Sequence, residues 1–141
     1  MKNIHPYFNF NGNTEEAFNF YKSVFGGEFL GVMKFKDMPD AQNFPTEVQE
    51  KIMHISLPLC NGIIMMGTDL IESMGHKFIP GNNMHIMIAT DSKEEADNLF
   101  NKLSVGGKIE MPMADQFWGD YYGNFTDKFG VNWMIDFSKE Q

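Results

Sequence analysis

The sequence predicts an α+β fold made of two similar modules, each with the element order strand–helix–strand–strand–strand. The first observation behind this prediction is a repeat: IHPYFNFNGNTEEAFNFYKSVFGG near the start resembles MHIMIATDSKEEADNLFNKLSVGG from Met84 onward. The second is periodicity, because each copy passes from alternating apolar residues to apolar residues at helical spacing, and then ends on a glycine pair. A helix between one strand and three more must cover one face of a mixed sheet.

The first module opens with a strand over residues 4–10, where apolar and polar side chains alternate. Asn13 and Glu16 have the spacing of a capping box, so we expect a helix that starts at Asn13 with the asparagine side chain as its cap. Gly26 and Gly27 end this helix, because glycine adopts the left-handed conformation at little cost. The remaining expected elements are strands over 28–35, 51–59 and 63–66, a tight turn at Asn61-Gly62, and an irregular loop over 37–50.

The second module repeats this order after a linker over residues 69–81. Ser92 and Glu95 form a capping box, and the helix that follows runs to about Val105. The expected strands cover 83–89, 108–113, 121–126 and 131–137, with a turn at Phe129-Gly130. The chain is therefore interpreted as a single domain, 1–141, with modules over about 1–68 and 82–141.

Composition excludes several classes of function. The chain has 141 residues and a formal charge of −8, which argues against binding nucleic acid, because phosphate binding draws on lysine and arginine. The same charge argues against anionic membrane surfaces, and no apolar run approaches the length of a membrane span. Cys60 is the single cysteine, so no internal disulfide can form. We therefore expect a cytoplasmic protein.

The strand alternation also predicts which face of each sheet meets the helix. The more apolar face includes Ile4, Phe8 and Phe10 in the first strand and Met84 in the first strand of the second module. The period of two sends the other residues to the opposite face. These residues are His5, Tyr7, Asn9, His54, Ser56, His85, Met87, Asn132, Met134 and Asp136.

Several sequence blocks resemble one protein superfamily. They are Pro6-Tyr7, Asn11-Gly12-Asn13, Phe25-Gly26-Gly27, Gly107-Lys108-Ile109-Glu110-Met111, Phe117-Trp118-Gly119, Phe125-Thr126-Asp127-Lys128-Phe129-Gly130-Val131 and Trp133-Met134-Ile135. The chain resembles the vicinal oxygen chelate superfamily, which includes glyoxalase I, bleomycin-resistance proteins and extradiol dioxygenases, and within it the PhnB-like branch. The resemblance implies paired βαβββ modules that form a curved mixed sheet around a cleft for a metal or a ligand, and it also implies a homodimer.

The resemblance further implies four positions for metal ligands, of which the chain fills only part. His5 matches the first position and His85 the third. Met65 or Met66 falls at the second, and Met134 at the fourth, where glyoxalase I-like sites use a carboxylate. Because a thioether is a poor ligand for Ni²⁺, Zn²⁺ or Fe²⁺ beside imidazoles, we disfavour a divalent metal and glyoxalase I activity. His54 or Asp136 could instead complete a rearranged site, since the alternation places both on the same face.

The leading hypothesis is therefore a protein that binds a small organic ligand in a polar and aromatic cleft. The residues expected to line it are His5, Tyr7, His54, His85, Trp118, Tyr122 and Met134. The aromatic block over 116–122 is as consistent with a ligand wall as with a dimer interface or ordinary core packing. Three alternatives stay open. They are a lyase, isomerase or dioxygenase-type enzyme that uses metal bound by His5 and His85, a metal-free enzyme that uses a histidine for acid–base chemistry, and a dimer that sequesters a drug as bleomycin-resistance proteins do. No catalytic residue follows from the sequence.

Overall fold

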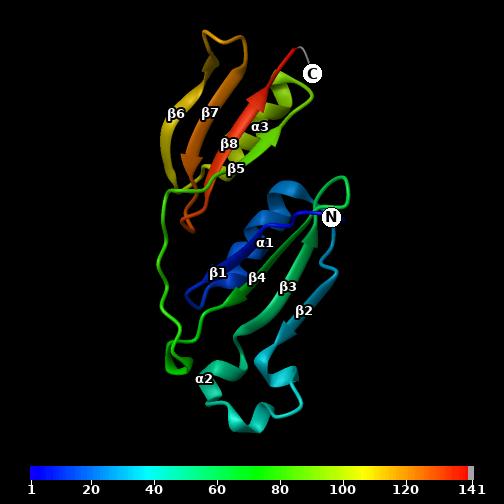
Figure 1. The fold of residues 1–141 in the computed structure, drawn as a ribbon, viewed down its shortest axis with the longest axis vertical. Helices are drawn as coiled ribbons and strands as arrows, with labels where there is room; N and C mark the ends of the chain where they lie inside the picture. Colours follow the sequence, from blue (N-terminus) through cyan, green and yellow to red (C-terminus); the bar gives the residue numbers. More distant parts are fainter. Residues whose placement is uncertain (140–141) are drawn as a thin grey trace. The chain divides into compact units, whose positions relative to one another are not determined.

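The computed structural model describes residues 1–139, and the chain divides into two compact units, residues 1–79 and the part from Pro80 onward. Each unit contains a four-stranded sheet with one long helix packed against it (Figure 1). The predicted α+β fold with two βαβββ modules is confirmed. None of the helices in the described part of the chain is long and apolar enough to cross a membrane.

The first unit contains a mixed sheet with strand order β1-β4-β3-β2. Its elements are β1 (Tyr7–Phe10), α1 (Thr14–Phe25), β2 (Gly31–Lys34), β3 (Ile52–Pro58) and β4 (Ile64–Asp69). Strand β1 runs parallel to β4, whereas the other neighbouring pairs are antiparallel. The hairpin between β3 and β4 turns at Asn61 and Gly62, both with positive φ (51° and 78°), as the sequence predicts.

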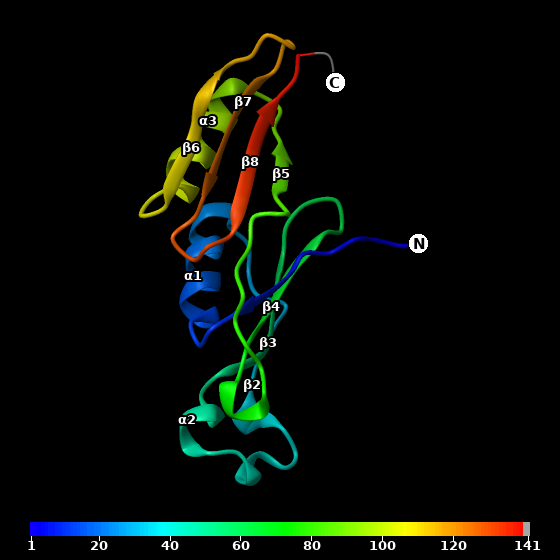
Figure 2. The same cartoon turned by 60° about the vertical axis from the view of Figure 1, so that its left-hand side comes forward.

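The second unit has the same topology, with strand order β5-β8-β7-β6 and β5 parallel to β8. Its elements are β5 (Ile86–Ala89), α3 (Lys93–Leu103), β6 (Lys108–Asp115), β7 (Tyr121–Thr126) and β8 (Asn132–Phe137). Figure 2 shows β5 beside β8 and β6 at the other edge. In the parallel pairs, Met66 faces Tyr7 and Met134 faces Met87, so the two methionines occupy equivalent positions in their units.

The buried side chains lie mainly between each helix and its sheet. In the first unit Phe8 contacts the rings of Phe18 and Tyr21 on α1, and in the second Phe100 on α3 contacts Phe125 on β7. The placement of Ile4 and Met84 on the helix-covered faces is wrong. Both are exposed, because they precede the first residues of β1 and β5 and no helix reaches them.

The two helices begin differently, and one expected cap is wrong. Ser92 accepts a hydrogen bond from the Glu95 amide (3.0 Å), as predicted. Asn13 makes no side-chain cap, and the buried carboxylate of Asp69 instead accepts hydrogen bonds from the Thr14 amide (3.0 Å) and hydroxyl (2.6 Å). Asp69 is the last residue of β4 rather than the first residue of a linker.

The segment expected as an irregular loop over 37–50 is mostly folded into short helical turns. These are η1 (Phe35–Asp37), η2 (Ala41–Asn43) and α2 (Thr46–Gln49), and a further turn, η3 (Glu72–Met74), follows β4. Phe35, Val48 and Ile71 form a small core, against which Met38, Phe44 and Met53 pack. This core corrects the loop prediction, because apolar residues on both sides of Pro39 and Pro45 pack against one another.

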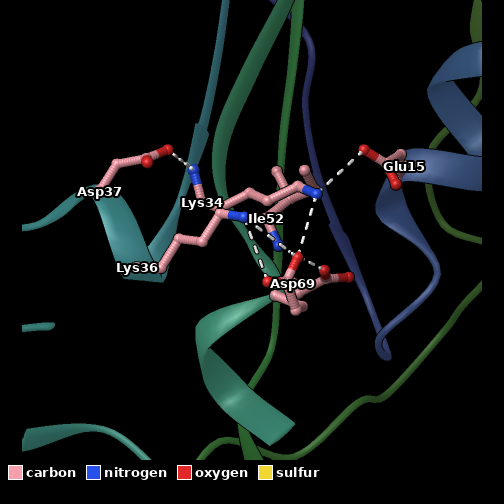
Figure 3. A network of polar contacts seen from close by, with 7 residues as sticks. Glu15, Lys34, Lys36, Asp37, Ile52 and Asp69 are labelled. Carbon is pink, nitrogen blue, oxygen red and sulfur yellow. Dashed lines mark hydrogen bonds and ion pairs between the residues drawn. The ribbon is translucent and has the colours of Figure 1, made fainter. Parts of the chain in front are cut away.

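Ion pairs connect the two ends of this segment to each other and to β2. Lys34 lies 3.3 Å from Glu50 and 3.8 Å from Glu15, and Lys36 lies 3.1 Å from Glu50 (Figure 3). The hydrogen bonds and charges of Lys36 and Lys34 lower the pKa of Glu50. Asp37 also accepts a hydrogen bond from the Lys34 amide (2.9 Å), which ties η1 to the end of β2 (Figure 3).

Candidate functional site

Each sheet has a second face, opposite its helix, which we call the helix-free face. In the first unit it carries Tyr7, Asn9, His54, Ser56, Met66 and Thr68, and in the second Met87, Tyr122, Asn124, Met134 and Asp136. These residues alternate along their strands with the buried residues that meet the helices. The register makes His54 equivalent to Tyr122 and Ser56 equivalent to Asn124.

Tyr7 and His54, both predicted ligand-contacting residues, are in contact. The Tyr7 hydroxyl lies 3.3 Å from His54 Nδ1, and the ring centroids are 5.8 Å apart. Because β4 separates their strands, the two side chains reach towards one another across it. Burial raises the pKa of Tyr7, so the phenol stays neutral and can donate a proton in a hydrogen bond.

His5 is held in a protonation pattern that opposes metal binding. Its Nδ1 accepts a hydrogen bond from the Ile64 amide (2.9 Å), so a neutral ring carries its proton on Nε2. A histidine that binds a metal through one ring nitrogen normally donates the N–H of the other. His5 would have to give up its bond to Ile64 before either nitrogen could act in that way. His5 thus pairs the amide of Ile64, the first residue of β4, next to the bond from the Met66 amide to the Pro6 carbonyl (3.0 Å).

The expected second ligand position needs correction. Met65 is fully buried and lies on the helix-covered face, as does Gly67 beside Phe18 on α1. Met66 is the residue of this pair that lies on the helix-free face, at the position equivalent to Met134 in the second unit. Within residues 1–139, no three His, Cys, Asp or Glu side chains gather as a metal would require.

The second unit places two polar groups on its helix-free face, Asn124, which was not expected there, and Asp136, which was expected on this face as a possible metal ligand. Asn124 is only 7% exposed; its Nδ2 donates to the Tyr122 hydroxyl (2.9 Å), and its Oδ1 is buried without a hydrogen-bond partner. Asp136 faces Tyr122 across the strand pair and is also buried. Burial and a hydrogen bond with Asp120 raise the pKa of Asp136.

The turn between β6 and β7 brings an aromatic group to this face. The ring of Trp118 contacts that of Tyr122, with centroids 5.9 Å apart, and Phe117 contacts Trp118 but is 98% exposed. Backbone hydrogen bonds between Gln116 and Asp120 (2.8 Å) and between Gly119 and Gln116 (3.0 Å) close the turn. Trp118 and Asp120 therefore come from one closed turn, and Tyr122 and Asp136 from the strands beside it.

The pair Tyr7 and His54 in the first unit, and the residues around Trp118 and Tyr122 in the second, are suited to binding a ligand through hydrogen bonds and ring contacts. Tyr7 and His54 can exchange donor and acceptor roles, and His85 lies half-buried immediately before β5. Asn124 could have been found from the sequence, since alternation in YYGNFT places it on the face of Tyr122. Asp120 lies in a turn, so the periodicity of the strands does not predict on which side of the sheet it lies.

Comparisons with known proteins agree on a family. Residues 2–136 match the profile of the family described as 3-demethylubiquinone-9 3-methyltransferase. The protein YjdN of Escherichia coli (strain K12) is 32% identical, with 98% of this chain and 97% of YjdN covered.

Solved structures agree with this family assignment. Protein PA1353 from Pseudomonas aeruginosa is 36% identical, with 96% of each chain covered and a TM-score of 0.83. A putative 3-demethylubiquinone-9 3-methyltransferase, PhnB protein, from Bacillus cereus is 29% identical, with 96% of this chain and 98% of that chain covered and a TM-score of 0.77. A glyoxalase/bleomycin resistance protein/dioxygenase family enzyme from Burkholderia phytofirmans shares the fold at 14% identity, with 94% and 95% covered and a TM-score of 0.61.

Proposed function

Because this chain belongs to the PhnB-like family described as 3-demethylubiquinone-9 3-methyltransferase, within the vicinal oxygen chelate superfamily, we propose that it binds a small organic molecule on the helix-free faces of its sheets. The contacting residues in this proposal are His5, Tyr7, His54, His85, Trp118, Tyr122 and Met134.

The observation that carries the proposal is the uncharged character of the first unit's helix-free face. None of its residues on β1, β3 and β4, namely Tyr7, Asn9, His54, Ser56, Met66 and Thr68, is a lysine, arginine, aspartate or glutamate. A sheet face turned permanently to water normally carries charged side chains. Aromatic rings, a thioether and neutral hydrogen-bonding groups together are typical of a surface that receives an organic ligand.

The family description names a methyltransferase, and we leave that activity out of the proposal. Nucleotide-derived donors are typically bound by a glycine-rich turn between a strand and a helix in a parallel sheet. The turn from β1 to α1 reads NGN and that from β5 to α3 reads TDS, and each sheet has only one parallel strand pair. The metal-dependent alternative requires His5 to change its tautomer, for the reason given above.

A fragment screen observed through the protein's amide NMR signals tests the proposal. We expect flat aromatic compounds with a hydrogen-bonding group to shift the signals of Tyr7, His54 and Met66. Tyr7→Phe, which keeps the ring but removes the hydroxyl, should weaken these compounds, whereas Asn19→Ala on the exposed side of α1 should not. The proposal fails if no compound shifts these signals, or if the shifts concentrate on α1.

Metal binding is tested separately, by elemental analysis of protein purified without chelator or affinity tag and by titration with Zn²⁺, Ni²⁺, Mn²⁺ and Fe²⁺. We expect no stoichiometric metal. A metal that is lost in both His5→Ala and His85→Ala would favour the metal-dependent enzyme instead.

We also propose that the protein is a homodimer in the cytoplasm that binds neither nucleic acid nor membranes. The exposed Phe117 and the half-exposed Trp118, whose rings are in contact, support a second copy as partner, because adjoining exposed apolar side chains are typical of an interface. The single free Cys60 suits a reducing compartment. Sedimentation of the wild type and Phe117→Ser tests the dimer: a monomer at micromolar concentrations would overturn it, together with the drug-sequestering alternative.

A further inference from the structure

Asn124 is the starting point, because its buried amide oxygen lacks a partner. Its side chain is more than nine-tenths buried, and its Oδ1 is the only buried side-chain oxygen or nitrogen atom without a hydrogen bond among residues 1–139. A buried acceptor left unpaired costs about 1–3 kcal/mol, so natural proteins rarely keep one without a use. The other end of the amide donates to the Tyr122 hydroxyl, which leaves the phenol proton available to donate.

Two carboxyls lie beside this pair. Asp136 faces Tyr122 across the strands and is in hydrogen-bond contact with Asp120. Such contact requires one carboxyl to hold a proton, and both causes acting on Asp136, burial and the neighbouring acid, raise its pKa. A positive charge placed between the two carboxyls would replace that proton and relieve their repulsion.

An aromatic surface borders the same groups. The closed turn that holds Asp120 also holds Trp118, whose ring contacts Tyr122. Aromatic faces attract organic cations, whereas a hydrated metal ion prefers a shell of oxygen ligands. The acceptor oxygens and the aromatic rings therefore both favour an organic cation that carries N–H groups.

We propose that the helix-free face of the second unit is a binding site for an organic ammonium, in which Asn124 and the pair Asp120 and Asp136 accept its N–H hydrogen bonds and Trp118 covers its apolar part. This proposal rests on the proposed function and deepens it by naming the class of ligand.

Calorimetric titration with three probes of similar shape, benzylammonium, benzyl alcohol and benzoate, tests the charge requirement. We expect benzylammonium to bind and the neutral and anionic probes to bind at least tenfold more weakly. Its binding should shift the amide NMR signals of Tyr122, Asn124 and Asp136. Equal binding of all three probes, or no benzylammonium binding at about 10 mM, the weak end of ligand affinities, would overturn the proposal.

Matched variants separate the site from general charge attraction. Asp120→Asn, which keeps the size of the side chain on an accessible turn, should weaken benzylammonium at least tenfold. Asp115→Asn removes the same charge from an exposed carboxylate paired with Lys93 (2.9 Å) and should change affinity less than twofold. Trp118→Ala should weaken binding about two- to fivefold, the range for an exposed cation–π contact. Equal losses in Asp120→Asn and Asp115→Asn would overturn the proposal.

A final measurement distinguishes this inference from the function on which it rests. Mg²⁺ and Ca²⁺ are titrated in the same experiment, and displacement of benzylammonium by either at stoichiometric levels would overturn the ammonium assignment in favour of a metal. If benzylammonium fails while neutral aromatic fragments still shift Tyr7 and His54, the ammonium site is wrong and small-molecule binding stands. If neither happens, both fail.

Discussion

Removing the Asp69 carboxylate should weaken the first unit far more than an ordinary surface change. The side chain is 3% exposed and accepts three hydrogen bonds, from the Thr14 amide (3.0 Å), the Thr14 hydroxyl (2.6 Å) and the Ile52 amide (2.8 Å). It therefore holds the start of α1 and the start of β3 to the end of β4. Figure 3 shows the bond between Asp69 and Ile52.

The magnitude follows from the groups left behind in Asp69→Ala. Two backbone N–H groups lose a buried acceptor, at about 1–3 kcal/mol each, and the buried Thr14 hydroxyl loses its bond to the carboxylate as well. We therefore expect a loss of about 3 kcal/mol in the free energy of unfolding. With an m-value of about 2 kcal/mol/M, the urea midpoint falls by about 1.5 M. Asp69→Asn keeps one acceptor oxygen and should lose less.

Urea unfolding followed by circular dichroism gives the midpoint, and amide hydrogen exchange resolves where protection is lost. We expect faster exchange in α1 and β3 and unchanged exchange in α3. The matched control is Asp40→Ala, an exposed aspartate without a side-chain cap, which should change stability by no more than about 0.5 kcal/mol. A loss in Asp69→Ala no larger than in this control would refute the role of the carboxylate.

Three further outcomes are expected. Gly67→Ala brings a Cβ within 2.6 Å of a buried phenylalanine ring and should cost about 1–3 kcal/mol in urea unfolding, whereas Gly31→Ala, with 3.9 Å of space, should be neutral or slightly stabilising. The hydrogen bond to Asp97 raises the pKa of Tyr121 to about 12, so its stabilising effect is complete below pH ~10, the ordinary tyrosine pKa, and disappears as the pH rises to about 12. In Asp97→Asn the free energy of unfolding, measured below pH 10 and near pH 12, should fall less with pH than in the wild type. An unchanged dependence on pH would contradict this prediction. Burial, and after it the neighbouring Asp120, raise the pKa of Asp136. The protonated Asp136 therefore stabilises the fold below pH ~4, and this contribution is lost as the pH rises through the pKa of the folded state. Asp136→Asn should gain stability relative to wild type between acid and neutral pH, and a relative loss would contradict this reasoning.

Periodicity predicted the parts of the fold that depend on local pattern. The alternation around Phe8 and Phe10 and a helical stripe that includes Ala17 and Tyr21 predicted the strand, the helix and the face on which they meet. Ser92 was recognisable as a cap because its partner is three residues away.

Contacts between residues that are far apart in the sequence could not be predicted. Asp69 supplies the cap of α1 from 55 residues away, a distance at which no capping motif is visible. The sequence left the second position open between Met65 and Met66, because an uncertainty of one residue in strand register reverses the face. The contact between Asp120 and Asp136 depends on the direction of a turn, which composition does not specify.

The different helix caps imply a different order of events when the two units fold. The cap of α3 comes from its own sequence, so this helix can begin to form before any strand has paired. The cap of α1 exists only after the chain between Thr14 and Asp69 has closed into a loop, which is entropically costly and slow. Two copies of one architecture thus differ in when the helix cap can form: the cap of α3 needs only the neighbouring residues, whereas the cap of α1 needs the end of β4 in place.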